Sequence, residues 1–338
     1  MSIKFHLLGK PGKDNALMVW INSGTKLYRI LFDCGENVLN ELKYSDISSI
    51  DYLFFSHFHL DHAAGFDYFL RRNYDRPDKP VRIFGPQDTI KIIHHRLSGY
   101  TWNLVDDVPG KWIITEIKED SLKTVSLKTS ESFSRRHFSG KKLFKRRLID
   151  NADFSVDAVL LNHIIPSAAY RITEKESHNI DKKKLSELNI TPGPWLEKVK
   201  DFSVNGKTRL ILNNQTYTIS RLRKELLIRT EGESIAYLTD FIYDERSVRR
   251  AVSLIKNCDT VFCESQYSSA DFKLAKKNYH LTASQTAMLA KKANAKKLIL
   301  FHISDRYNLK EDLQILLNNA KEKFPGTNFP EEWFVESL

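Results

Sequence analysis

Cysteines and long hydrophobic runs are scarce in this sequence. Only three cysteines, an odd number, occur among the 338 residues, so we do not expect the disulfide framework of a small secreted domain. A chain of this length can bury a sizeable core without such bonds. No run of eighteen apolar residues is present, and residues 1–6 do not begin a signal peptide with a long apolar core. Internal repeats and low-complexity segments are also absent. These absences predict a cytoplasmic protein that does not bind a membrane.

Acidic residues are outnumbered by basic ones. The 52 lysines and arginines exceed the 42 aspartates and glutamates, which gives a net charge of +10 and a pI near 9.3. Such a charge favours a polyanionic partner, either a nucleic acid or an anionic surface, although many basic proteins bind no nucleic acid. Residues 171–230 hold thirteen basic against seven acidic residues, so they supply six of the ten net charges.

This basic segment interrupts the pattern of the rest of the chain. It contains Lys182, Lys183 and Lys184 and a turn-prone sequence at residues 191–195. We interpret residues 172–230 as a protruding insertion within a single domain of residues 1–338, and an ordinary solvated charged face is the alternative. A second basic stretch, residues 135–147, could contact a nucleic-acid backbone or form a mobile loop.

Short apolar runs bounded by turn residues predict strands, and stretches with helical spacing alternate with them. This alternation predicts an α/β protein in which two sheets stack face to face and helices cover the outer face of each sheet. The predicted strands are residues 3–8, 16–21, 26–32, 51–55, 81–84, 156–165, 235–238, 260–263 and 297–301. The predicted helices are residues 36–43, 63–72, 87–97, 246–256, 282–292 and 310–320.

Three histidines and an aspartate stand within six residues directly after the predicted strand at 51–55. The hexapeptide reads His57-Phe58-His59-Leu60-Asp61-His62. In an extended segment, side chains at i and i+2 point the same way, so His57 and His59 can bind one cation while Asp61 and His62 reach a second. The alternative is a polar loop whose histidines are solvated, or histidines with a structural role in the core. The density of ligand-type residues favours a site for two metal ions.

Two metal ions need further ligands, and the ends of other predicted strands supply them. His163, Asp240 and His302 each stand at or just after the end of an apolar run. A lone histidine is usually structural, but these three residues and the hexapeptide together complete two coordination spheres. The predicted assignment gives one metal His57, His59 and His163, gives the other Asp61, His62 and His302, and makes Asp240 the bridge.

The chemistry of these ligands indicates the metal and the reaction. Imidazole and carboxylate without thiolate favour zinc, and manganese would also suit the oxygen-rich site. Water between two such ions loses a proton near neutral pH, which predicts hydrolysis of an ester, most simply a phosphodiester. Asp33 also ends a predicted strand and could support a metal-bound histidine, or it could be a turn aspartate. Cys34 beside it is better explained as a small buried apolar group than as a ligand.

The hexapeptide, Asp240 and His302 resemble the metallo-β-lactamase superfamily. Within it the sequence is most similar to the ribonuclease Z family, endonucleases that trim the 3′ trailer from precursor tRNA. Residues 192–195 resemble the Gly-Pro segment of that family's tRNA-clamping arm, and residues 11–15 resemble its short Pro-Lys-Asn loop near the active site. The other similar segments are residues 32–36, 55–65, 161–163, 170–171, 237–240, 264, 280–285 and 298–307.

The resemblance implies an αββα sandwich, two zinc ions and an RNA substrate, most simply precursor tRNA. It also implies that Asp61 is the general base and that His280 donates a proton to the leaving oxygen or stabilises its charge. From the residues alone His280 could be a bystander, because Thr282 behind it could cap a helix. The family often forms homodimers, so we expect one here. Further residues assigned by the resemblance and by charge are Glu264, as a support for the centre, and Lys13, Lys182, Lys183, Lys184, Gly193, Pro194 and Arg306, as substrate contacts.

Several positions depart from the family pattern. Phe241 is bulky where the family usually has a small residue, Ala169 replaces the glycine expected before Tyr170, and residues 100–150 match no segment of the family. These differences leave the predicted metal ligands unchanged. They leave open which substrate the protein cleaves. One alternative is a hydrolase of the same superfamily that acts on a small phosphodiester, thioester or lactone. Another is a nucleic-acid-binding protein whose metal centre no longer turns over.

Overall fold

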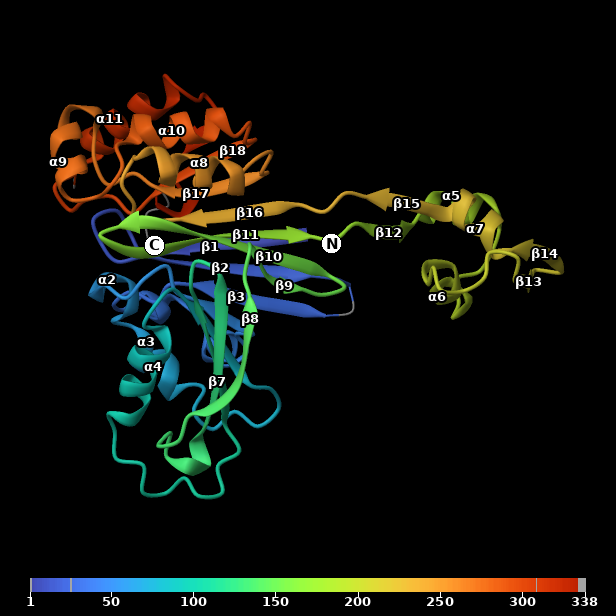
Figure 1. Ribbon diagram of the computed structural model, residues 1–338. Coiled ribbons are helices and arrows are strands. Elements are labelled where there is room, and N and C mark those ends of the chain that lie inside the picture. Colours follow the sequence, from blue (N-terminus) through green and yellow to red (C-terminus); the bar gives the residue numbers. More distant parts are fainter. Residues whose placement is uncertain (1, 25, 308, 334–338) are drawn as a thin grey trace. The chain divides into compact units, whose positions relative to one another are not determined.

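The computed structural model describes residues 2–24, 26–307 and 309–333 (Figure 1). The chain forms two compact units. The main unit contains Ser2–Thr173 and the residues from Glu233 onward, and the small unit contains Glu174–Gly232. Among the described residues, none of the helices has the length and apolar character needed to span a bilayer.

The first sheet of the main unit has eight strands that follow the order of the chain. They are β1 (Ser2–Leu8), β2 (Ala16–Asn22), β3 (Leu27–Phe32), β4 (Tyr52–Phe54), β5 (Val81–Gly85), β6 (Lys111–Ile117), β7 (Ser121–Lys128) and β8 (His137–Leu143). The strands from β3 to β6 run parallel, so the carboxyl ends of β3 and β4 lie side by side. This places the segment after Phe32 beside the hexapeptide.

The second sheet has seven strands, in the order β19-β18-β17-β16-β11-β10-β9. Their bounds are β9 (Arg147–Asp150), β10 (Phe154–His163), β11 (Ile165–Glu174), β16 (Ser234–Leu238), β17 (Thr260–Glu264), β18 (Lys297–Phe301) and β19 (Thr327–Asn328). β16, β17 and β18 are parallel neighbours. Their carboxyl ends therefore meet at one edge of the sheet, and Asp240 and His302 follow two of them.

Helices lie on the outer faces of both sheets, as Figure 1 shows. The helices of the first half are α1 (Tyr44–Ser48), α2 (Leu60–Ala63), α3 (Phe66–Arg71) and α4 (Thr89–Ser98), with short 3₁₀ helices at η1 (Val38–Glu41) and η2 (Thr129–Glu131). Those of the second half are α8 (Glu245–Leu254), α9 (Phe272–Lys277), α10 (Ala283–Lys292) and α11 (Lys310–Lys321), with 3₁₀ helices at η3 (Ser269–Asp271) and η4 (Glu331–Trp333).

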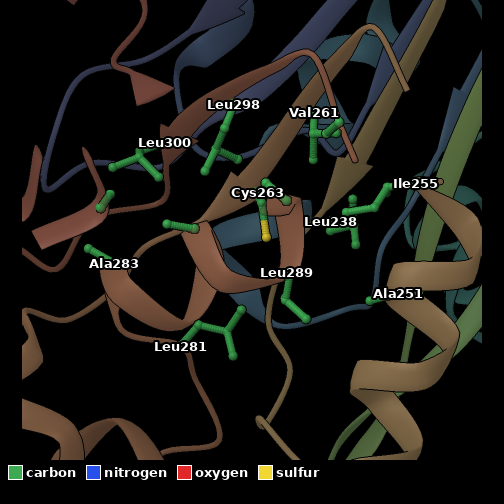
Figure 2. Packing of buried hydrophobic residues seen from close by; sticks show 14 of the residues in the cluster. Leu238, Ala251, Ile255, Val261, Cys263, Leu281, Ala283, Leu289, Leu298 and Leu300 are labelled. Atoms are coloured by element: carbon green, nitrogen blue, oxygen red, sulfur yellow. The ribbon is translucent and has the colours of Figure 1, made fainter. Parts of the chain in front are cut away.

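Three buried layers hold this architecture together. Between the sheets, the rings of Phe32 and Tyr237 stack with centroids 5.3 Å apart. A second layer joins the first sheet to α3 and α4. In the third, Leu281 and Leu289 pack with Leu298 on the outer face of the second sheet (Figure 2). The αββα sandwich predicted from the sequence is confirmed.

Two local predictions are wrong, and one of two alternatives for a third segment is excluded. Residues 36–43 do not form an α-helix, because Asn37 adopts a left-handed conformation with φ of 59° and only the 3₁₀ turn Val38–Glu41 follows. Residues 156–165 are not one strand, because the chain reverses at Ile164 (φ 63°) and begins β11. The basic stretch at 135–147 contributes the edge strand β8, so a mobile loop is the wrong interpretation for residues 137–143.

The small unit has its own hydrophobic core, which includes Leu185, Val199, Leu222 and Leu226. Two antiparallel strand pairs and three helices surround it: β12 (Ser177–Ile180) with β15 (Leu227–Thr230), β13 (Arg209–Leu212) with β14 (Gln215–Thr218), and α5 (Lys182–Glu187), α6 (Trp195–Lys200) and α7 (Ile219–Leu226). A core of this kind makes the insertion a folded body. Its predicted role in binding a substrate stays a prediction.

Candidate metal centre

The hexapeptide begins where β4 ends and is held in place by its backbone. The Cys34 N–H donates to the His62 carbonyl at 2.8 Å, and the Gly65 N–H donates to the Cys34 carbonyl at 2.9 Å. A Cβ on Gly35 would lie 2.6 Å from the Asp61 carbonyl oxygen, so only glycine permits this close approach. Cys34 itself is fully buried among apolar residues, as the sequence indicates.

The geometry of the hexapeptide differs from the extended segment predicted above. His59 is extended, with φ of −65° and ψ of 157°, but Asp61 and His62 lie in α2. The side chains of His57 and His59 thus extend from strand-like backbone. Those of Asp61 and His62 extend from a helical turn. The two pairs of side chains still reach two separate groups of ligands.

The candidate ligands form two groups that share one carboxylate. In each group, one donor atom from every residue lies within 4.8 Å of the others. Asp240 Oδ2 lies 3.6 Å from His57 Nε2 and 3.5 Å from His163 Nε2. Its other oxygen, Oδ1, lies 3.3 Å from His302 Nδ1. The first group is His57, His59, His163 and Asp240, and the second is Asp61, His62, Asp240 and His302.

Buried nitrogen atoms in these groups fit bound cations. His57 Nε2, His62 Nε2 and His302 Nδ1 are buried and make no hydrogen bond to the described part of the protein. Burying a polar atom in this way is costly unless it finds a partner, and an imidazole nitrogen is a standard zinc ligand. The residues present therefore fit a metal centre of the kind that the sequence predicts.

The electrostatics of the centre favour neutral imidazoles on one side and a cation on the other. Burial, with the neighbouring histidines, lowers the pKa of His57 and His59, which leaves them in the neutral form that binds metal. Burial alone would lower the pKa of His62 as well, but Asp240 and Asp33 raise it well above its usual range. Positive charge is thus stabilised between these carboxylates, where a metal ion would carry it.

Asp33 holds the ring of His62 in position. Its Oδ2 accepts hydrogen bonds from His62 Nδ1 at 2.9 Å and from Tyr237 Oη at 2.8 Å. The Ser56 N–H donates to Asp33 Oδ1 at 2.6 Å, and the Ser56 hydroxyl donates to Oδ2 at 2.7 Å. Because Nδ1 is occupied, Nε2 of His62 is directed toward Asp61 and Asp240. Ser56 and Tyr237 were not singled out by the sequence, since each has many structural roles elsewhere.

Two further contacts position His163 and His302. His163 Nδ1 donates to the Tyr279 carbonyl at 2.9 Å, which leaves Nε2 facing Asp240. The backbone N–H of His302 donates to Asn15 Oδ1 at 3.3 Å. Asn15 lies in the loop that resembles the family's Pro-Lys-Asn segment, and this contact gives it a structural reason to be there.

His280 borders the two groups and is paired with a buried carboxylate. Its Nδ1 donates to Glu264 Oε2 at 2.8 Å, and Glu264 Oε1 accepts the Phe241 N–H at 2.8 Å. Burial lowers the pKa of His280, but Glu264 and then Asp240 outweigh it and raise the pKa to about 9. The carboxylates around His280 thus favour its protonated form. Phe241 points into the buried core, so its size does not narrow the centre.

Three residues of the centre stand in left-handed backbone at strand ends. Asp33 follows β3 with φ of 56°, Asp240 follows β16 with φ of 49°, and His302 follows β18 with φ of 51°. Non-glycine residues adopt this conformation at a cost of the order of 1–3 kcal/mol, and such strain clusters at functional sites. The turn it makes redirects each side chain from the sheet toward the centre. The sequence carries no signal for this conformation.

The predicted substrate residues lie in both units. In the main unit, Lys13 and Arg306 lie in adjacent loops, because a Cβ on Gly12 would be 3.0 Å from Asp305 Cα. Arg306 Nη1 lies 3.3 Å from Asp271 Oδ1. In the small unit, Lys182, Lys183 and Lys184 are exposed at the start of α5. Gly193 and Pro194 directly precede α6, with Pro194 as its N-cap.

Comparison with known proteins places the chain in a family. It is 38% identical to the ribonuclease Z of Deinococcus radiodurans over 327 residues, which cover 97% of each chain. The chain belongs to the ribonuclease Z family. A ribonuclease Z of Bacillus velezensis is 28% identical over 88% of this chain and 84% of its own. Residues 13–190 also match the family model described as Anti-Pycsar protein Apyc1.

Solved structures share the fold of this ribonuclease Z family member. The metallo-β-lactamase fold protein YhfI of Bacillus subtilis superposes with a TM-score of 0.58 at 15% identity, covering 97% of this chain and 96% of that one. Human tRNase Z, short form, superposes with a TM-score of 0.50 at 21% identity over 90% and 94%. Membership of the family confirms the resemblance seen in the sequence, and with it a metal-dependent hydrolase.

Proposed function

We propose that this protein is an endoribonuclease that uses two zinc ions to remove the 3′ trailer from precursor tRNA. The observation that carries the proposal is the match to a ribonuclease Z over 97% of both chains. That match extends over every segment that contributes to the centre and over the small unit. Since all three cysteines are buried and unpaired, we also place the protein in the reducing cytoplasm.

The two groups of ligands have the chemistry that two zinc ions require. We assign His57, His59 and His163 to one ion, Asp61, His62 and His302 to the other, and Asp240 to both. Manganese would suit the second group, which has two carboxylates. When bound, the ions would acidify a water molecule and neutralise charge on the phosphodiester.

Asp61 and His280 supply the proton transfers. Burial would raise the pKa of Asp61, but His302 and His62 lower it far below its usual value, so the carboxylate stays ionised. We assign to this ionised carboxylate the proton of the attacking water, as the family resemblance implies. His280, held in the protonated form by Glu264, donates a proton to the leaving oxygen as the bond from that oxygen to phosphorus breaks.

The small unit would bind the RNA backbone. Its exposed Lys182, Lys183 and Lys184 can neutralise phosphates, and the loop at Gly193 and Pro194 would contact the folded RNA. Lys13 and Arg306 are the corresponding candidates in the main unit. We further propose that the protein acts as a homodimer, as the family resemblance implies.

Mapping the ends left on a precursor tRNA tests the proposal. The zinc-loaded protein should leave a 3′-hydroxyl at the end of the mature acceptor stem. Asp61→Ala should lose cleavage, and metal analysis of the same sample separates loss of the base from loss of zinc. Cleavage of the parent elsewhere in the RNA, or none at all, would contradict the assignment to precursor tRNA. An inactive parent that still binds RNA would favour a binding protein.

A second candidate is hydrolysis of a small phosphodiester. It would use the same candidate ligands, and residues 13–190 also match a second family model, described as Anti-Pycsar protein Apyc1. That segment holds the hexapeptide and His163 but stops before Asp240, His280 and His302. Turnover of bis(p-nitrophenyl) phosphate without cleavage of RNA would favour this candidate, whereas turnover of thioesters or lactones alone would exclude both.

A further inference from the structure

A cavity of about 780 Å³ opens beside His280. Its walls come from the segment after Asp240, from α9, from the first turns of α10 and from the end of α11. Sites for small organic groups typically measure about 300–1,000 Å³. The cavity is therefore large enough for a nucleoside. None of the metal ligands lines it, so it is distinct from the centre described above.

The wall that contains His280 is anchored by buried side chains. Leu281 and Ala283 are fully buried on the second sheet, as Figure 2 shows. Thr282 caps α10 and forms a reciprocal capping box with Gln285. These contacts fix the position of His280 relative to α10, so a group in the cavity would be held at a defined distance from the proton donor.

Aromatic rings and a cation stand at this cavity. Phe272 lines it with 49% of its surface exposed, although large apolar side chains are usually buried. Tyr243 contributes a second, half-buried ring, whose hydroxyl accepts a hydrogen bond from Lys292 Nζ at 3.3 Å. Lys276, on the same helix as Phe272, is exposed at the cavity. Exposed aromatic rings beside cations are the usual platform for stacking single-stranded bases.

We propose that this cavity binds the base of the nucleotide whose 3′ oxygen is the leaving group, with the base against Phe272 and its 5′ phosphate near Lys276. The inference rests on the proposed function, because it takes His280 as the donor to that oxygen. His280 is both the proposed proton donor and a lining residue of the cavity. The nucleotide whose 3′ oxygen receives the proton from His280 is therefore the one whose base can enter the cavity. The cavity would then position the last nucleotide of the mature RNA.

Methionine spectra test occupancy of the cavity without any turnover. The chain has only three methionines; Met288 lines the cavity, and Met18 is fully buried in the other half of the main unit. With ¹³C-methyl methionine, adenosine 5′-monophosphate should shift the Met288 signal saturably and leave Met18 unmoved. Ribose 5-phosphate, which lacks the base, should not. Phe272→Ala should weaken the nucleotide's effect at least fivefold.

Cleavage kinetics provide the second test. On intact precursor tRNA, Phe272→Ala should lower kcat/KM by about 5- to 150-fold, which is the range for losing one stacked base. On a substrate that is abasic at the last mature nucleotide, parent and variant should differ less than twofold. Tyr44→Ala, which removes an exposed ring (59% of its surface, against 49% for Phe272) from α1, is the matched control and should behave as the parent.

The outcomes separate this inference from the proposed function. If the Met288 signal does not move at millimolar nucleotide in a protein that cleaves precursor tRNA, the cavity does not bind the nucleotide. The proposed function would be unaffected. Equal losses by Phe272→Ala on intact and abasic substrates would also overturn the inference about the cavity. A Met288 shift in a protein that does not cleave precursor tRNA would support the cavity and reject the function.

Discussion

Replacing Glu264 with glutamine should move the alkaline limit of activity to lower pH. The pKa of His280 stands at about 9 against an ordinary value of 6.5, although burial acts to lower it. Glu264, whose carboxylate lies 2.8 Å from His280 Nδ1, is the strongest of the groups that raise it. The rise from 6.5 to about 9 corresponds to about 3 kcal/mol in favour of the protonated ring. A neutral amide at position 264 should therefore lower the pKa by about two units.

The sign of the effect follows from the role of His280 as a donor. The protonated ring is active, so kcat of the parent should hold through neutral pH and fall as pH rises through the pKa, whereas kcat of Glu264→Gln should fall about two units earlier. Bound zinc would repel the protonated ring and lower the pKa of His280 in both proteins, so the difference between the two pKa values is the quantity to test. In the metal-free protein the same pKa shift stabilises the fold below about pH 6.5, and this stabilisation is lost as pH rises through about 9.

Two measurements check the reasoning. Histidine NMR of the metal-free protein measures the pKa of His280 directly. The pH profile of kcat for the zinc-loaded protein shows whether protonation of His280 controls turnover. Glu131→Gln is the matched control, because Glu131 pairs with His137 at 2.5 Å on the surface and its loss should leave the profile of the parent. A Glu264→Gln variant with an unchanged profile and an unchanged His280 titration would refute the argument. A shifted titration with an unchanged profile would show that His280 is not the proton donor.

Further predictions concern metal binding, stability and RNA binding. Asp33→Asn should weaken zinc binding by about 10- to 100-fold in a chelator competition, because it disturbs the acceptor that orients His62. Leu289→Ala should lower the free energy of unfolding by about 2–5 kcal/mol in urea titrations, since Leu289 is buried between α10 and the second sheet. Replacing Lys182, Lys183 and Lys184 with alanine should weaken tRNA binding and reduce the slope of log K against log salt by about 3, that is, by about 1 for each lysine.

The candidate ligands can be picked out in the sequence because they stand at or shortly after the ends of buried strands. Strands buried on both faces read as apolar runs, so a histidine or aspartate at the end of such a run is visible. The edge strand β8 was missed, because most of its side chains are exposed and its pairing with β7 uses backbone atoms. Its Lys141 even lies opposite Lys123, a pair of like charges that no strand pattern would favour. The contacts of Ser56 and Tyr237 with Asp33, and of Asn15 with His302, were not predicted because they join residues far apart in the sequence.

The division of the chain into two units explains why the hexapeptide cannot identify the substrate. Every candidate metal ligand and both proposed proton-transfer residues belong to the main unit, where two sheets and left-handed turns at strand ends position them. A substitution at any of these positions would leave a buried polar atom without a hydrogen-bond partner or a buried carboxylate without a compensating charge. Few substitutions are therefore tolerated there. The small unit has a separate core, and the cavity at Phe272 is formed by helices outside the ligand groups. Residues in those places can change the substrate without disturbing the centre, so the decisive evidence for RNA must come from experiments on them.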